Sequence, residues 1–233
     1  MKDYTNYASA QSTTIDAGLR SHMIKVYNYM AAGLGVSGLV AYFAYTSPEF
    51  AALAFQLRWV CFFAILGMAF LVMPRMYSMS ENGAKLTFFA YSAILSISIA
   101  PMFAIYTGES IARTFFITAS VFGGLSLLGY TTKKDLTSWG TFGAIGVIGV
   151  FFAGLLNYFF FKSTGMQLVT NIVAIIAVIA LTAYDTQKVK QAYYVSGGNP
   201  AIANKSAIIG ALQLYFDFVY LFIHLMQILG NRR

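Results

Sequence analysis

The stretch IIGALQLYFDFVYLFIHLMQIL, residues 208–229, decides the fold of this chain. It is long enough to cross the hydrocarbon core of a bilayer as a helix, which takes about 20 apolar residues. Its polar residues recur at spacings of four, three, four and three: Gln213, Asp217, Tyr220, His224 and Gln227. On a helix they form one stripe. An aspartate at mid-membrane costs about 2.5 kcal/mol or more. We therefore predict a central helix, enclosed by the others, with Asp217 in a protected interior.

The composition indicates an integral membrane protein. Hydrophobic residues make up 58% of the chain and charged residues 10%, whereas soluble domains hold about 25% charged residues. The net charge is +7, but the Lys and Arg residues lie between apolar runs, which is typical of membrane-flanking charge and gives no indication of nucleic-acid binding. Residues 1–25 are polar and lack the apolar core of a signal peptide. We expect them to form a cytoplasmic tail ahead of a transmembrane domain, residues 26–230.

Seven apolar runs predict an all-α membrane protein with seven transmembrane helices, the last one central and surrounded by the other six. The runs cover residues 26–46, 53–73, 86–106, 114–130, 139–161, 166–186 and 207–229. The connections are short except for residues 187–206, where a Gly-Gly-Asn-Pro turn predicts a surface loop with, as an alternative, a helical extension at its start.

The distribution of positive charge predicts the orientation. Alternate connections hold ten Lys and Arg on the side of the N-terminus and five on the other side, which places the N-terminus in the cytoplasm. Arg232 and Arg233 then fall outside, against this rule. Two interpretations stay open: the odd number of helices tolerates them, or the last segment is re-entrant and returns to the cytoplasm.

Two carboxylates are the candidates for chemistry. Only Asp185 and Asp217 lie within or at the end of apolar runs. Asp185 ends its run in the sequence LTAYDTQ, and Asp217 lies about ten residues into the next run, about 15 Å along a helix. An upright alignment would leave the carboxylates at different depths, and a tilt or a late helix end would bring them together. The sequence permits contact without requiring it.

If the two aspartates meet, they form a proton-dependent latch. Two carboxylates that share a site cannot both ionise cheaply, so the pair holds one proton and titrates as a unit. The protonated pair closes by a hydrogen bond, and the deprotonated pair repels and admits a cation. Arg75 is a candidate partner for the deprotonated form. The alternative interpretation is that each aspartate is a satisfied interior group or a helix-end cap.

The remaining polar residues predict no enzyme. Gln213, Tyr220 and His224 are expected to line the polar stripe or a pore. For His224 a neutral, hydrogen-bonded interior histidine is favoured over a proton relay. The two histidines lack the spacing of a metal site, and the sequence contains neither a GxSxG elbow nor a phosphate-binding loop. We expect no catalytic residue and no cofactor.

Four segments resemble the Bax inhibitor family, the transmembrane Bax inhibitor motif proteins, and in particular its bacterial members. They are TKKDLTSWG at 132–140, LTAYDTQKVK at 181–190, LQLYFDFVYLFIHLMQILG at 212–230 and YTGESIARTFFIT at 106–118. The resemblance covers essentially all seven runs, and the motifs are specific when taken together.

The resemblance implies a last helix surrounded by two three-helix groups in the bacterial inner membrane. It also implies a pH-sensitive calcium leak that contributes to calcium homeostasis and to stress or cell-death modulation. The proton-sharing pair of the family corresponds to Asp185 and Asp217, which would hold calcium weakly and transiently. An arginine that pairs with one of them corresponds to Arg75.

Two observations bear on conduction. The family usually has Asn three residues after the aspartate of the last helix, where this chain has Tyr220, whose larger ring would narrow a pathway. Calcium prefers six to eight oxygen ligands, and two carboxylates offer at most four. A transient site in a leak is therefore expected, with calcium as the permeant ion.

Two other functions stay open. Some bacterial relatives resemble inhibitors of a membrane-bound AAA protease that act through the N-terminal tail, so residues 1–25 would bind such a partner here. A proton-coupled transporter is the third possibility, and nothing in the sequence names its substrate.

Overall fold

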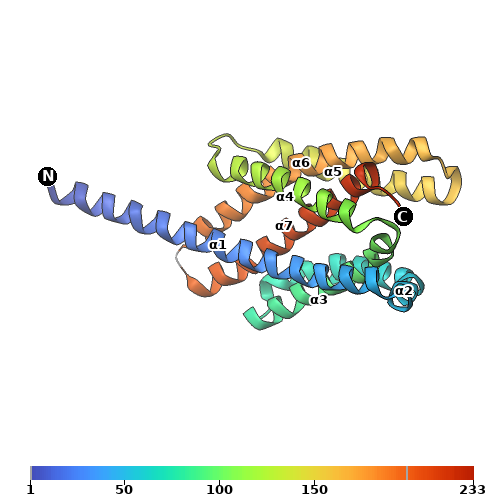
Figure 1. The fold of residues 1–233 in the computed structure, drawn as a ribbon. Coiled ribbons are helices and arrows are strands. Elements are labelled where there is room, and N and C mark those ends of the chain that lie inside the picture. The colour runs from blue at the N-terminus through green and yellow to red at the C-terminus, as the bar shows by residue number, and fades with distance from the viewer. Residues whose placement is uncertain (1, 198) are drawn as a thin grey trace.

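The computed structural model is a bundle of seven long helices (Figure 1). It describes residues 2–197 and 199–233, with side chains from residue 17 onward. The helices are α1 (Lys2–Thr46), α2 (Pro48–Gly67), α3 (Glu81–Ile105), α4 (Gly108–Thr131), α5 (Thr137–Leu156), α6 (Thr164–Val195) and α7 (Pro200–Leu229). Each predicted apolar run therefore falls within a helix or its direct continuation.

Two helices end in irregular turns. α2 continues as a π-helical turn, η1 (Met68–Val72), and then as a 3₁₀ helix, η2 (Met73–Ser78). α5 continues as a second π-helical turn, η3 (Asn157–Phe161). Such turns are uncommon and frequently mark functional sites or hinges.

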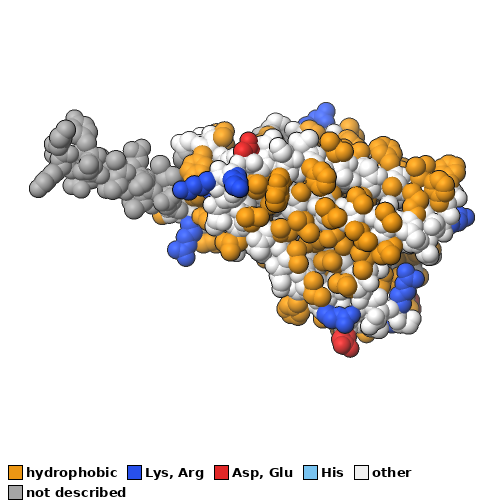
Figure 2. All heavy atoms as spheres, turned by 90° about the horizontal axis from the view of Figure 1, so that it is seen from above, with side chains coloured by type: hydrophobic (Ala, Val, Ile, Leu, Met, Phe, Trp, Pro, Cys, Tyr) orange, Lys and Arg blue, Asp and Glu red, His pale blue; other side chains and the backbone are white. Residues whose placement is uncertain are grey.

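Six segments of the described chain are long and apolar enough to cross a membrane. They are Pro48–Arg75, Glu81–Ile105, Gly108–Thr131, Thr137–Phe161, Thr164–Val195 and Pro200–Leu229. α1 is not among them and packs along α3 and α7. Figure 2 shows hydrophobic side chains spread over one face of the bundle, with Lys and Arg toward its margins. This is the surface expected of a protein surrounded by lipid.

α7 lies at the centre of the bundle. Of its most apolar 18-residue window 78% is buried, compared with 39% for α6 and 6% for α5. α1, α3, α4 and α6 pack directly against α7, α2 packs onto α3, and α5 packs onto α6. Figure 1 shows α7 between a group of α1, α2 and α3 and a group of α4, α5 and α6. The predicted all-α fold with a central last helix is confirmed.

Glycines allow the outer helices to approach closely. Gly129 of α4 lies so near the backbone carbonyl of Ala183 on α6 that a Cβ would not fit. A Cβ on Gly143 of α5 would lie 2.6 Å from the carbonyl oxygen of Ala177 on α6. Small residues at such crossings let membrane helices pack backbone against backbone. This explains how α4 and α5 can both pack closely against α6.

The prediction of a surface loop at residues 187–206 is wrong over most of its length, and the alternative, a helical extension at its start, is confirmed. α6 continues to Val195, and α7 begins at Pro200. Gly197 adopts a left-handed backbone with φ of 59°, just beyond the end of α6. The Asn199 side chain accepts hydrogen bonds from the N–H groups of Ala201 and Ile202 and so caps α7. The Asn-Pro pair that was interpreted as a turn is the start of a helix.

The C-terminus lies at the same end of the bundle as the connection between α3 and α4. The N–H of Thr107 donates to the carbonyl of Asn231 at 3.0 Å, and the N–H of Arg233 donates to the carbonyl of Ile105 at 3.0 Å. α7 therefore crosses the bundle once and is not re-entrant. The connections that follow α4 and α6 lie at the opposite end.

Part of the predicted tail packs against the bundle. Leu19, His22 and Met23 of α1 are buried, and the ring of His22 contacts that of Tyr193 on α6 at a centroid distance of 5.4 Å. The side chains of residues 1–16 lie outside the described residues. The division at residue 25 and the cytoplasmic location of the tail stay predictions.

Candidate functional site

Asp217 lies inside the bundle on α7. Its side chain is 6% exposed, and its Oδ2 atom has no hydrogen-bond partner within the part of the chain that the structure describes. A buried carboxylate without a partner is costly when it is ionised. This position therefore demands a proton, a cation or a compensating group.

Asp185 of α6 is the acidic group that acts on Asp217. The packing of α6 against α7 brings the levels of the two aspartates close together. Val189 of α6 contacts Gly210 of α7, where a Cβ would lie 2.7 Å from the Val189 Cγ2 atom. Because the helices are antiparallel, Asp217 lies about three residues, or about 4.5 Å along the axis, from the level of Asp185.

The extended ends of the helices remove the expected difference in depth. Asp185 does not end its helix, since α6 continues to Val195, and α7 begins at Pro200 rather than near residue 207. Both aspartates therefore lie well inside their helices. Between them the structure records no direct hydrogen bond among the residues it describes.

A chain of hydroxyl groups runs beside Asp185, and the sequence analysis did not find it. The hydroxyl of Tyr27 on α1 lies 2.6 Å from Oγ of Ser126 on α4. Ser126 Oγ lies 3.0 Å from Oγ1 of Thr186, the residue after Asp185. These contacts link three helices next to the aspartate, and small hydroxyl residues on apolar helices leave no distinct sequence signal.

The structure does not bring Arg75 to the aspartates. Arg75 is exposed on η2, and its guanidinium donates a hydrogen bond to the carbonyl of Leu71 in the preceding turn. In the described part of the chain no ion pair joins Arg75 to Asp185 or Asp217. A pairing would require η2 to move.

The C-terminal half of the polar stripe lines a cavity of about 790 Å³ at the end of the bundle that holds η3. Tyr220, His224 and Gln227 face it, and Gln213 does not. Nδ1 of His224 lies 2.9 Å from Oδ1 of Asn171 on α6, and the rings of Tyr220 and His224 lie 4.5 Å apart. His224 therefore has a partner inside the bundle.

A second buried polar cluster lies on the opposite side of α7. The hydroxyl of Tyr215 lies 2.9 Å from Oγ of Ser37 on α1. Ser96 of α3 donates to Ser37 at 2.8 Å. Tyr215 does not belong to the predicted stripe, because its position on α7 faces the other three-helix group.

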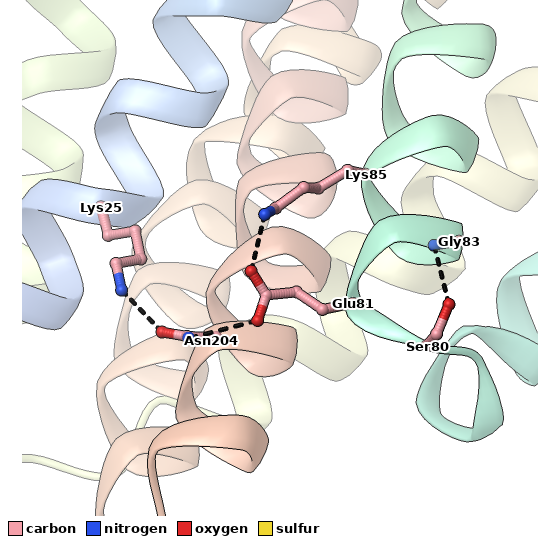
Figure 3. A network of polar contacts seen from close by, with 6 residues as sticks. All are labelled: Lys25, Ser80, Glu81, Gly83, Lys85 and Asn204. Carbon is pink, nitrogen blue, oxygen red and sulfur yellow. Dashed lines mark hydrogen bonds and ion pairs between the residues drawn. The ribbon is translucent and has the colours of Figure 1, made fainter.

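A polar network ties the start of α7 to α1 and α3 (Figure 3). Lys25 Nζ donates to Oδ1 of Asn204 at 2.6 Å, and Nδ2 of Asn204 donates to Glu81 at 3.2 Å. Glu81 also forms an ion pair with Lys85 at 2.6 Å. Across the described residues no group of three or more His, Cys, Asp or Glu side chains gathers to hold a metal ion.

These features define a class of protein: a multi-pass helical membrane protein whose central helix carries a buried carboxylate, with no hydrogen-bond partner at Oδ2 among the residues described. Comparison with known protein families identifies the family within this class. The family model described as "Inhibitor of apoptosis-promoting Bax1" matches residues 19–233. The chain belongs to the Bax inhibitor family.

Several bacterial proteins are similar over nearly their whole length. The chain is 42% identical to the uncharacterized protein RP147 of Rickettsia prowazekii, over 100% of both chains. It is 37% identical to the inner membrane protein YbhL of Escherichia coli, over 93% of this chain and 94% of that protein. A protein of Caulobacter vibrioides is 38% identical over 97% of this chain and 94% of its own length.

Proposed function

We propose that this protein is a pH-sensitive calcium leak of the bacterial inner membrane, gated by Asp185 and Asp217. The observation that carries the proposal is the Asp217 carboxylate, which is buried on the central helix, has no partner at Oδ2 among the described residues and lies about 4.5 Å along the bundle axis from the level of Asp185. The protein contributes to calcium homeostasis and, through it, to stress or cell-death modulation.

The gate operates by a shared proton. With one proton the pair forms a hydrogen bond that holds α6 and α7 together and closes the pathway. Without it two like charges repel across the helix interface, and a divalent cation neutralises both. The flux of calcium therefore rises as the pH rises.

Arg75 is the cation that stabilises the deprotonated pair in this proposal. Its present partner is a backbone carbonyl of its own segment, so the 3₁₀ helix η2 and the π-helical turn η1 must rearrange to deliver it. Irregular helical turns are suited to such hinge motion. On α7, Tyr220 lies one turn from Asp217 toward the cavity. A calcium ion that moves between Asp217 and the cavity must therefore pass the Tyr220 ring.

Calcium binds weakly and transiently in this account. Two carboxylates offer fewer oxygens than the six to eight that calcium prefers, which suits a permeant ion. The protein acts without a cofactor and is not an enzyme. Its N-terminus lies in the cytoplasm, the orientation that the Lys and Arg distribution favours.

The proposal is tested by calcium flux into liposomes that contain the purified chain, with empty liposomes as the control. We expect a flux that depends on the protein and is larger at alkaline than at acidic pH. A chain that passes no calcium at any pH refutes the leak. The better account is then a regulator that binds a membrane-bound AAA protease through residues 1–25, which loses its effect when residues 1–14 are deleted.

A further inference from the structure

The cavity beside η3 has the wrong charge for a calcium vestibule. Of all its lining residues only Lys162 carries a formal charge, and none is acidic. The rest of its polar lining consists of neutral side chains, chiefly amides and hydroxyls of η3, α6 and α7 such as Asn157, Gln167, Asn171 and Gln227. A positive and hydrogen-bonding lining favours an anion.

Aromatic and aliphatic side chains of the candidate membrane spans α2 and α5 also line the cavity. Phe62 of α2 stacks on Phe151 of α5 at a centroid distance of 6.5 Å. Trp59 of α2 contacts Tyr158 of η3 edge to face at 5.9 Å. Aromatic side chains thus bridge α2 and α5 beside the cavity, and such rings accommodate acyl chains at the membrane interface.

We propose that this cavity binds a phospholipid with an anionic headgroup. The phosphate lies at Lys162, beside the start of α6. There the Ser163 N–H donates to Asn157 and the Ser163 side chain caps Met166, while the first N–H groups of the helix, those of Thr164 and Gly165, favour an anion. The neutral side chains of α6 and α7 hydrogen-bond the headgroup. An acyl chain follows the aromatic wall of α2 and α5.

A lipid fits this lining better than a free anion. An inorganic phosphate would use Lys162 and its neighbours and leave the aromatic wall unoccupied. A cavity of about 790 Å³ also far exceeds the space that such an ion needs. The inference does not rest on the proposed leak, because it concerns binding alone.

The two tryptophans of the chain allow a direct test. Trp59 contacts Tyr158, which lines the cavity, whereas Trp139 lies in the first turn of α5 at the opposite end of the bundle. In the full-length Trp139→Phe protein in detergent micelles, Trp59 is the only tryptophan. Its fluorescence is measured while phosphatidylglycerol with brominated acyl chains is added, and in parallel with brominated phosphatidylcholine.

Two matched pairs of variants separate the site from ordinary lipid contact. Lys162→Asn removes the charge, and Asn tolerates the left-handed backbone of this residue, φ 49°. Lys133→Asn is its control at the opposite end. Gly154→Leu fills the cavity, since a Cβ there meets nothing within 4 Å. Gly149→Leu is its control, on the same helix and equally free, outside the cavity.

The proposal predicts that the brominated phosphatidylglycerol quenches Trp59 at lower concentration than the phosphatidylcholine. Lys162→Asn weakens this quenching by about tenfold, as the loss of one charge-assisted contact implies. Gly154→Leu abolishes the saturable part of the Trp59 quenching. The control variants Lys133→Asn and Gly149→Leu behave like the parent protein.

Equal quenching by the two lipids, with no effect of Lys162→Asn or Gly154→Leu, overturns the proposal. Relief of the quenching by inorganic phosphate overturns it as well, since the site then takes a free anion. Because the readout is lipid binding, its failure is distinguishable from a failure of the calcium leak.

Discussion

Val189 of α6 packs directly against Gly210 of α7, and this contact sets the levels of the two aspartates. A Cβ on Gly210 would lie 2.7 Å from Cγ2 and 3.1 Å from Cγ1 of Val189, closer than side chains normally approach. Any residue larger than glycine would push the helices apart. The contact therefore maintains the proximity of Asp185 and Asp217.

Gly210→Ala is expected to lower the stability of the protein by about 1–3 kcal/mol, the usual cost of overpacking. Thermal unfolding in detergent measures the effect. Gly35→Ala is the matched control, because a Cβ at Gly35 meets nothing within 4 Å. A Gly210→Ala protein as stable as the Gly35→Ala protein would show that the helices are not in close contact here.

Gln187 on α6 forms two hydrogen bonds with the backbone of the segment that connects α4 and α5. Its Oε1 accepts from the N–H of Leu136 at 3.0 Å, and its Nε2 donates to the carbonyl of Lys134 at 2.8 Å. Gln187→Leu leaves both backbone groups without this partner, at a cost of about 1–3 kcal/mol. Thermal unfolding of Gln191→Leu, an exposed glutamine one turn later, serves as the comparison and should match wild type.

His22 makes the docking of α1 sensitive to acid. Burial lowers the pKa of His22 from its ordinary value of 6.5, and the charge of Lys25 lowers it further. The unfolded segment therefore binds more protons than the docked one below about pH 6.5, so the docking is stable above this pH and weakens as the pH falls.

Hydrogen exchange of residues 17–25 tests whether the docking of α1 weakens as the pH falls. Protection should decrease between about pH 7.5 and pH 5.5 in wild type, after correction for the intrinsic exchange rate. His22→Phe keeps a ring against Tyr193 and should remove the pH dependence. Protection that grows on acidification would contradict the assignment.

The buried hydroxyl cluster of Tyr215, Ser37 and Ser96 is expected to contribute little. The carbonyls of Gly33 and Ser92 lie 3.1 and 2.6 Å from the hydroxyls of Ser37 and Ser96, so in Tyr215→Phe each hydroxyl keeps an acceptor for its single proton. We expect a loss of about 0.6–1 kcal/mol. In a double-mutant cycle, adding Ser37→Ala to Tyr215→Phe should cost less than Ser37→Ala alone; a fully additive result would mean that the two hydroxyls are independent.

The sequence predicted the features that depend on the membrane. Asp217 in an apolar run has to face the interior, since lipid cannot solvate it, and this requirement alone places α7 at the centre. The seven apolar runs follow from the same solvent constraint. Hydropathy carries no such constraint beyond the bilayer, which is why the extension of α6 stayed one of two alternatives and the early start of α7 was missed.

The features that the sequence did not predict have physical reasons. Lys188, Lys190 and Gln191 are polar, so the sequence left a loop and a helical extension as alternatives for them. In the structure they lie on α6, where their neighbours Gln187 and Val189 are buried. Contacts between distant segments gave no signal. Asn171 as the partner of His224 and the hydroxyl cluster around Tyr215 depend on the packing of helices, which spacing within one segment does not reveal.

The most direct test of the shared proton is the pH profile of calcium flux in liposomes, from about pH 5 to about pH 9. It is recorded for wild type, Asp185→Asn, Asp217→Asn and the double variant. The account predicts that the calcium flux of wild type rises with pH and that all three variants lose this dependence. The loss in the double variant should be no larger than the loss in either single variant. A rise with pH that persists in Asp217→Asn would contradict the gate.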